Sequence, residues 1–502
     1  MKKVGLGLLL SVFTFVGIAQ EYNEKAEEYS KTITAEDLKK HLSIIASDKF
    51  EGRETGEKGQ KMAMDYLIEN FKSYGIKPIK EYGYIQTFDL LEQKTENIQL
   101  KIGEEAFEVL KDFTVSPSVI LKRAIESEIV FVGYGIEEGN YTSYKGLDIK
   151  GKAVFIMDGM PGKTELAGKW LMKDRIALAK EKGAIVVLYH SLKLKDNLIK
   201  YEHYYSTPKL TLKEDVKDKQ TIVIASTTEL TQTITKAAGL RWKKILRKGI
   251  NSEKTKALTF QLEVNKPTEK LTSENVLAFI PGSENPEEVV VLTAHYDHIG
   301  IDGDKVFNGA DDDGSGTVSM LEIAQAFQMA VKDGLKPKRS ILIMPVSGEE
   351  KGLLGSKYYT NNPVFPLENT VANLNVDMIG RYDENHEEGD DYVYLIGSDK
   401  LSSTLHKVSE KVNELYTEIE LDYTFNDEND PNRFYYRSDH YNFAKNNIPV
   451  IFYFSGVHED YHKETDTVEK IDFEKTARIA RLVFLTAWEI ANRDNRIEVD
   501  GE

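Results

Sequence analysis

The C-terminal half of the chain is built from apolar runs separated by amphipathic segments. Continuous apolar stretches such as VVVLTA (289–294), ILIMPV (341–346) and VIFYF (450–454) predict buried strands, because a strand covered on both faces shows no alternation. The segment SGTVSMLEIAQAFQMAVKDG between the first two has the apolar spacing and terminal glycine of an amphipathic helix. Strands alternating with helices indicate a mixed, mostly parallel α/β sheet flanked by helices.

The N-terminal half follows other patterns. Residues 34–75 carry helical signals, including Thr34 as a candidate N-cap, and residues 81–115 alternate like short strands. Strand-like SEIVFVGYGI and KAVFIMDGM are followed by a helical segment and another strand, which predicts a strand–helix–strand unit in a separate accessory domain. The boundaries that we predict are 1–20 for a signal peptide, 21–116 and 263–502 for the two parts of the main domain, and 117–262 for an insert.

The first twenty residues resemble a secretory signal. Two lysines precede an apolar run from Val4 to Ala19, which is short for a membrane span and typical of a signal peptide. We therefore expect an exported protein, periplasmic or secreted, with an uncleaved anchor as the alternative. The chain has no cysteine, so disulfides and lipid attachment through cysteine are excluded, and any metal must be held by His, Asp and Glu.

Composition narrows the possible partners. The chain has 502 residues, of which 41% are hydrophobic, enough for a large core and more than one domain. A formal net charge of −17 argues against nucleic acid, which requires a basic face. No later segment is apolar enough to cross a membrane, so we expect no membrane association after signal cleavage. The oligomeric state is not predicted.

Histidines and acids follow the predicted strands of the C-terminal half. Sites in parallel sheets form at the carboxyl ends of strands, which makes these residues candidates for chemistry. They occur in the segments AHYDH (294–298), GADDDGSG (309–316), SGEE (347–350), NVDMIG (375–380) and GVHEDYHKETDT (456–467). Histidines and carboxylates without cysteine suit zinc or a related divalent cation.

The stretch GADDDGSG places three carboxylates side by side. One interpretation is a solvated acidic loop, and another is a calcium loop. The EF-hand pattern fails, because aligning Gly314 with its invariant glycine puts Gly309 and Met320 at positions that need ligands. A third interpretation is that the middle carboxylate bridges two cations about 3.5–4 Å apart.

In this order, AHYDH, GADDDGSG, SGEEKGLLGS, NVDMIG, SDHYNF and YHKETDT resemble the secreted di-zinc aminopeptidases related to bacterial leucyl aminopeptidase and aminopeptidase Y. The resemblance is strong over residues 271–490 and extends to SDKFEGRETGEKG (47–59). VFVGYGI and KGLDIKGKAVF resemble a protease-associated domain. The resemblance implies a zinc-exopeptidase fold with a mostly β insert.

The resemblance also implies roles for single residues. One metal would be held by His295, Asp312 and Asp377, and a second by Asp312, Glu350 and His462. The remaining implied roles are those of Glu349 as general base, Asp297 as the partner that orients His295, and Tyr461 as a donor to the tetrahedral oxyanion. We expect His298, His440 and His458 to support the site rather than to bind metal.

The function that this resemblance implies is removal of the N-terminal residue from peptides with a free amino end, using two divalent metal ions. Zinc is the best match to the ligand types, and cobalt and manganese remain open. A related di-metal carboxypeptidase or dipeptidase is the alternative. A catalytically inactive binding protein and a glutaminyl cyclase are disfavoured, because every ligand position and Glu349 are filled.

Overall fold

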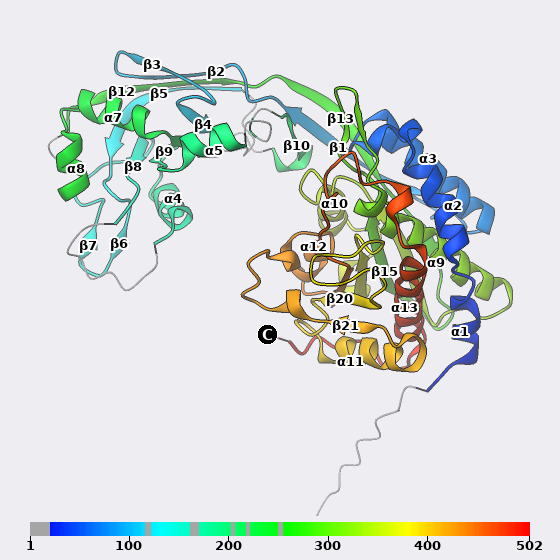
Figure 1. The fold of residues 1–502 in the computed structure, drawn as a ribbon. Coiled ribbons are helices and arrows are strands. Elements are labelled where there is room, and N and C mark those ends of the chain that lie inside the picture. The colour runs from blue at the N-terminus through cyan, green and yellow to red at the C-terminus, as the bar shows by residue number, and fades with distance from the viewer. Residues whose placement is uncertain are drawn as a thin grey trace, which may run out of the picture. The chain divides into compact units, whose positions relative to one another are not determined.

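The computed structural model describes residues 21–115, 122–160, 170–201, 205, 207–216, 221–248 and 255–501 (Figure 1). The predicted signal peptide, residues 1–20, lies outside this range. The chain divides into two compact units. The first contains the residues up to Gln86 together with Glu274–Glu502, and the second contains Thr87–Ser273.

The first unit is built on a seven-stranded mixed sheet with the order β14-β18-β15-β19-β22-β20-β21. The neighbours β18, β15, β19 and β22 run parallel to one another, whereas β14 and β20 pair antiparallel. The predicted mixed, mostly parallel α/β sheet is therefore confirmed. Its strands are β14 (Ala278–Ile280), β15 (Asn285–His295), β18 (Arg339–Val346), β19 (Thr370–Val376), β20 (Tyr392–Ile396), β21 (Glu420–Asp422) and β22 (Val450–Phe454).

Side-chain alternation sends the apolar residues of these strands to two different cores. On β15, Val290 and Leu292 pack into the core that contains α9 and α13, whereas Val289 and Val291 pack into the core that contains Tyr359 of α10. Because both faces are covered, the strand is apolar throughout, as predicted. Figure 1 shows α9 and α13 on one side of β15, with α10 and α12 on the other.

The helices of the first unit begin and end at recognisable signals. Thr34 caps α2 by accepting a hydrogen bond from the Asp37 main-chain N–H, and Gly75 ends α3 in a left-handed conformation. These helices are α1 (Glu24–Ser30), α2 (Ala35–Ile45), α3 (Lys58–Tyr74), α9 (Gly316–Lys332), α10 (Leu354–Asn361), α11 (Ser403–Val412), α12 (His440–Ala444) and α13 (Phe473–Asn492). None of the described helices combines the length and apolar character of a membrane span.

The second unit contains an eight-stranded sheet with the order β3-β2-β12-β5-β8-β9-β11-β4, and the unit is β-rich as predicted. Its strands are β2 (Ile98–Ile102), β3 (Glu105–Glu108), β4 (Phe113–Val115), β5 (Lys122–Phe131), β8 (Ala153–Ile156), β9 (Val186–His190), β11 (Ile222–Ser226) and β12 (Leu258–Asn265). Its helices are α4 (Met172–Glu181), α5 (Leu194–Lys200), α7 (Thr228–Ala237) and α8 (Trp242–Lys248).

The boundaries of this unit differ from the predicted insert, 117–262. Strand β2 pairs with β12, and β4 pairs with β11, so the residues before 117 that form β2 to β4 belong to the sheet of the second unit. The short strand β10 (Lys209–Leu212) pairs with β1 (Ile85–Gln93), and β13 (Thr268–Val276) completes that small sheet. Long-range strand pairing of this kind leaves no local signal in the sequence.

Candidate metal centre

The candidate residues of the first unit gather at one edge of its sheet. His295 is the last residue of β15, Asp377 directly follows β19, and Glu349 and Glu350 come shortly after β18. The loop after β22 carries His462. Because these strands are parallel neighbours, their carboxyl ends meet at the same edge. The sheet thus brings together side chains that are up to 167 positions apart, His295 and His462.

Asp312 lies between two groups of ligand atoms. Its Oδ1 is 3.2 Å from His295 Nε2, and its Oδ2 is 3.2 Å from His462 Nε2. On the first side, His295 Nε2 is also 3.6 Å from Asp377 Oδ1. On the second side, His462 Nε2 is 3.2 Å from Glu350 Oε2. The two oxygens of the Asp312 carboxylate therefore face two separate sets of possible metal ligands.

These separations fit a tetrahedral metal site. Zinc lies about 2.0–2.2 Å from its nitrogen and oxygen ligands, so two ligand atoms of one tetrahedron are about 3.3 Å apart. The groups around His295 and around His462 match that spacing. His298 Nδ1 also approaches the second group, at 2.9 Å from Glu350 Oε1 and 3.8 Å from Asp312 Oδ2. Its two distances depart from the tetrahedral spacing in opposite directions, so His462 is the better candidate ligand.

Several buried polar atoms in this cluster lie close to one another without forming a hydrogen bond of good geometry within the described chain. They are Asp312 Oδ2, Glu350 Oε1 and both ring nitrogens of His298, although Glu350 Oε1 is 2.9 Å from His298 Nδ1 and Asp312 Oδ2 is 3.2 Å from His462 Nε2. Buried polar atoms are almost always hydrogen-bonded, so carboxylate oxygens and imidazole nitrogens that converge without such bonds are a suitable ligand set for a cation. Two groups, His295 with Asp312 and Asp377, and His298 with Asp312 and Glu350, have ligand atoms close enough to hold a metal ion.

The orientation of the His295 ring is fixed by its other nitrogen. Nδ1 lies 3.0 Å from the main-chain oxygen of Asp297, to which an Nδ1–H can donate, and this leaves Nε2 free to act as a ligand. The Asp297 carboxylate is farther away, at 3.8 Å. It instead accepts hydrogen bonds from Thr55 Oγ1 at 2.6 Å and from the Glu349 main-chain N–H at 3.3 Å. Asp297 thus contacts the predicted ligand and the predicted base from one position.

The acids on either side of Asp312 bind main-chain donors. Asp313 accepts hydrogen bonds from the main-chain N–H groups of His295, Gly316 and Met378, so it joins β15, α9 and the loop after β19. Asp311 Oδ1 accepts from the Gly380 N–H, and its Oδ2 lies 3.3 Å from His458 Nε2. His458, which we expected to support the site rather than to bind metal, therefore lies against Asp311 and not against Asp312. The acidic run therefore has one carboxylate that faces the cluster and two that hold the loop.

Ionic contacts stabilise the charged forms of the second group. Burial lowers the pKa of His462, but the carboxylates of Asp312 and Glu350 raise it to about 10. Burial raises the pKa of Glu350, as does the charge of Asp312, yet contacts with His298 and His462 hold it at about 2. The contacts with His298 and His462 therefore keep the Glu350 carboxylate ionised, and the ionised carboxylate is the form that binds cations.

Glu349 differs from its neighbour Glu350. Its Oε2 is 3.9 Å from His295 Nε2, and it lines a pocket together with Asp312 and Asp377. Burial raises the pKa of Glu349 well above its usual value, and the negative charge of Glu350 adds to this effect. A carboxylate that readily takes up a proton beside a cation site is suited to general base chemistry.

Tyr461 lines the same pocket. Its ring stacks on His462, with centroids 3.9 Å apart, and its hydroxyl accepts a hydrogen bond from Arg437 Nη2 at 3.4 Å. Arg437 in turn stacks on Phe434, with its guanidinium carbon 4.9 Å from the ring centroid. A second arginine near this site, Arg381, pairs with Asp460 at 3.1 Å, so its role is structural.

Three residues that the sequence analysis did not single out support the cluster. Arg53 is fully buried and donates hydrogen bonds to the main-chain oxygens of Ile45, Tyr296, Asn308 and Gly309. Asp466 accepts from the main-chain N–H groups of Asp311 and Asp312, and Ser438 donates to Asp377. All three residues lie within segments that resemble the peptidase family, namely Arg53 in EGRETG, Ser438 in SDHYNF and Asp466 in YHKETDT. The segments therefore indicated the site, although the sequence did not indicate a role for these single residues.

Comparisons with known proteins agree with this geometry. Residues 275–487 match the family described as Peptidase family M28. A "Probable zinc metalloprotease" from Pyrenophora tritici-repentis is 30% identical over 269 residues, which cover 44% of this chain and 52% of that protein. The "probable leucine aminopeptidase 2" of Aspergillus oryzae is 25% identical over 440 residues, 86% of this chain and 75% of that protein.

A solved structure shares the fold over nearly the whole chain. The "Aminopeptidase from Aneurinibacillus sp. strain AM-1" is similar with a TM-score of 0.56 at 20% identity, covering 95% of this chain and 98% of that one. This likeness extends through both units. The chain spans about half the length of the Pyrenophora protein, 52%.

Proposed function

Since residues 275–487 match peptidase family M28, we propose that this chain is a zinc-dependent aminopeptidase that removes the N-terminal residue from peptides. The observation that carries the proposal is the position of Asp312. Its two oxygens face His295 Nε2 and His462 Nε2, each at 3.2 Å, which is the arrangement of a carboxylate shared by two cations.

The residues of the two groups would hold the metals. His295, Asp312 and Asp377 form the first set, and Asp312, Glu350 and His462 form the second. Imidazole nitrogens with carboxylate oxygens suit zinc, and also accept cobalt or manganese. The neighbouring carboxylates raise the pKa of His462 to about 10, so a metal bound there would displace the proton from this ring. Two divalent cations bound there would supply Lewis acidity towards the scissile carbonyl and an activated water.

Glu349 is the general base of the proposed reaction. It takes a proton from the attacking water and delivers it to the nitrogen of the leaving peptide. The hydrogen bond from the Glu349 main-chain N–H to Asp297 Oδ1, at 3.3 Å, fixes the main chain at Glu349 in the loop after β18. The Tyr461 hydroxyl donates a hydrogen bond to the oxyanion of the tetrahedral intermediate, and the Arg437 guanidinium next to that hydroxyl favours the developing negative charge.

The pocket beside the cluster would take the first side chain of the substrate. It is lined by Met378, Phe434, Phe452, Phe454 and Val457 in addition to the polar residues named above. An apolar, aromatic lining favours an apolar side chain over a charged one. The carboxylates of the cluster would attract the ammonium group of a free amino end.

Matched peptides test this function directly. The full chain, loaded with zinc, is incubated with a peptide whose amino end is free and with the same peptide acetylated, with and without chelator. Mass spectrometry should show chelator-sensitive loss of single residues from the free peptide only. Loss from the carboxyl end, or equal cleavage of the acetylated peptide, would assign a carboxypeptidase or dipeptidase function instead. A lack of any cleavage would overturn the proposed activity.

Export is a separate part of the proposal. It rests on the two lysines and the apolar run Val4–Ala19 at the start of the chain, which match a signal peptide. We propose that the mature protein is periplasmic or secreted. N-terminal sequencing of the protein purified from its native source should begin near residue 20, and an intact start at Met1 in a soluble cell fraction would contradict export.

A further inference from the structure

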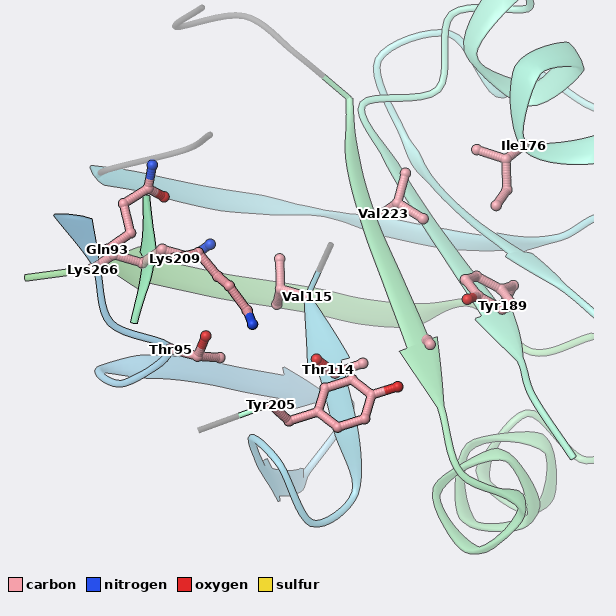
Figure 2. Close-up of a pocket in the computed structure, with 11 residues that line it drawn as sticks. Gln93, Thr95, Thr114, Val115, Ile176, Tyr189, Tyr205, Lys209, Val223 and Lys266 are labelled. Atoms are coloured by element: carbon pink, nitrogen blue, oxygen red, sulfur yellow. The ribbon is translucent and has the colours of Figure 1, made fainter. Parts of the chain in front are cut away.

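A cavity of about 400 Å³ lies within the second unit, and none of its lining residues is assigned to the reaction. Its walls come from β4, β9, β11 and the residues next to β12 (Figure 2). Cavities of this volume are within the range that holds small organic ligands. No residue of the described lining is acidic.

One end of the cavity carries buried nitrogen donors. Lys266 is 6% exposed and Gln93 is 3% exposed, so both are more than nine-tenths buried. Burial is the only cause that shifts the pKa of Lys266, so no described charged group pairs with its amine. Lys209 lines the same end, as Figure 2 shows. A buried ammonium group that opens into a cavity without a carboxylate partner requires a counter-ion or must lose its proton.

The other end of the cavity is apolar and aromatic. Figure 2 shows Ile176, Val223 and Tyr189 at that end, with Val115 between the two ends. Burial lowers the pKa of Lys266, and no described carboxylate offsets this effect. An inorganic anion would satisfy the lysine but leave the apolar end to water. A ligand that is anionic at one end and apolar at the other would fill both.

We propose that this cavity binds an organic carboxylate with an apolar body, whose carboxylate pairs with Lys266 and accepts a hydrogen bond from the Gln93 amide. Two sources share this chemistry. One is the carboxyl end of a peptide with an apolar last residue, and the other is a medium-chain fatty acid. The proposal is independent of the peptidase function, because none of the lining residues belongs to the metal centre.

The test uses the zinc-loaded full chain and calorimetric titration. The probes are N-acetylphenylalanine, its uncharged amide N-acetylphenylalaninamide, and decanoate. We expect at least one of the two carboxylates to bind. If the site takes peptide ends, N-acetylphenylalaninamide should bind at least 10-fold more weakly than N-acetylphenylalanine. If the site takes fatty acids, decanoate should bind more tightly than N-acetylphenylalanine. Binding of neither carboxylate at millimolar concentration, or equal binding of the acid and its amide without decanoate binding, would overturn the proposal.

A pair of variants separates this cavity from other sites. Lys266→Met should weaken carboxylate binding at least 10-fold, whereas Lys145→Met, which changes an exposed lysine of the same unit, should leave it unchanged. Circular dichroism checks that both variants fold. Should Lys266→Met be unfolded, Gln93→Leu replaces it, with a several-fold loss expected. Full-strength binding by a folded Lys266→Met variant would place the carboxylate elsewhere, including at the metal centre, and would overturn the proposal.

Discussion

The Ser438 hydroxyl donates a hydrogen bond to the Asp377 carboxylate, with Oγ 2.7 Å from Oδ2. Asn375 Nδ2 donates to the same hydroxyl oxygen at 2.8 Å, so the hydroxyl is held between strand β19 and the carboxylate that follows it. The other oxygen of Asp377, Oδ1, lies 3.6 Å from His295 Nε2. Ser438 therefore sets the rotation of a carboxylate whose free oxygen belongs to the candidate metal centre.

Replacing Ser438 should weaken metal binding without removing it. We expect Ser438→Ala to lower the affinity for zinc about 10-fold, because partners that orient metal ligands contribute at that level. Competition with a chromophoric chelator measures the affinity. Ser43→Ala, which removes an exposed hydroxyl bonded only to the Lys39 main-chain oxygen, is the matched control. Equal affinity in Ser438→Ala and the parent protein would show that Asp377 does not need this hydrogen bond.

Asp312 should be the residue on which both metals depend. We expect Asp312→Ala to bind fewer than one zinc per chain, since one substitution removes an oxygen ligand from each group. Asp377→Ala removes a ligand from the His295 group only, and should retain about one zinc. Metal content after dialysis, measured by mass spectrometry, compares the two variants. Two zinc ions per chain in folded Asp312→Ala would exclude the shared carboxylate.

Glu349 should affect turnover and not metal content. Glu349→Gln keeps the size of the side chain but cannot accept a proton, so we expect kcat to fall by about 10²–10⁴-fold while two zinc ions remain bound. Steady-state rates with a chromogenic amino acid amide, together with zinc analysis of the same sample, check both parts. Near-normal kcat in the zinc-loaded variant would assign the base to another residue.

Much of the sheet and of its edge could be predicted from sequence. The apolar runs that end in His295 and Val346 are strands with both faces covered, and continuous burial is what such runs indicate. Because the strands are parallel, their carboxyl ends meet at one edge of the sheet. Residues far apart in sequence could therefore be predicted to form one site. The cap of α2 by Thr34 followed equally from a local signal.

Features that depend on distant main-chain groups could not be predicted in this way. Arg53 contacts four carbonyl oxygens, two of them in the loop before Ala310, and nothing in its own segment indicates those partners. The second unit begins at Thr87 because β2 pairs with β12 across about 160 residues. The proximity of His298 to Glu350 likewise depends on how two loops meet.

A buried lysine on α13 gives a prediction for the stability of the first unit. Lys475 is 4% exposed, and its Nζ has no hydrogen bond to the rest of the described chain. The nitrogen lies 3.5 Å from the centroid of the Tyr392 ring and 4.1 Å from that of Tyr382. Burial lowers the pKa of Lys475 from 10.5 to about 7, although Asp311 and Asp472 act in the opposite direction.

The sign of the pH effect follows from proton counts. Between pH 7 and 10.5 the unfolded chain holds a proton on Lys475 that the folded chain has lost, so the free energy of unfolding rises with pH in this window. We expect Lys475→Met to increase that free energy at pH 7 by about 2–4 kcal/mol, since each pKa unit corresponds to about 1.4 kcal/mol, and to differ little from the parent protein at pH 10.5. Urea unfolding at pH 7, 8.5 and 10 measures the trend, with the exposed Lys407→Met as control. If Lys475→Met were less stable than the parent protein at pH 7, the contacts of the ammonium group with the Tyr392 and Tyr382 rings would outweigh its desolvation, and the lysine would be charged in the folded protein.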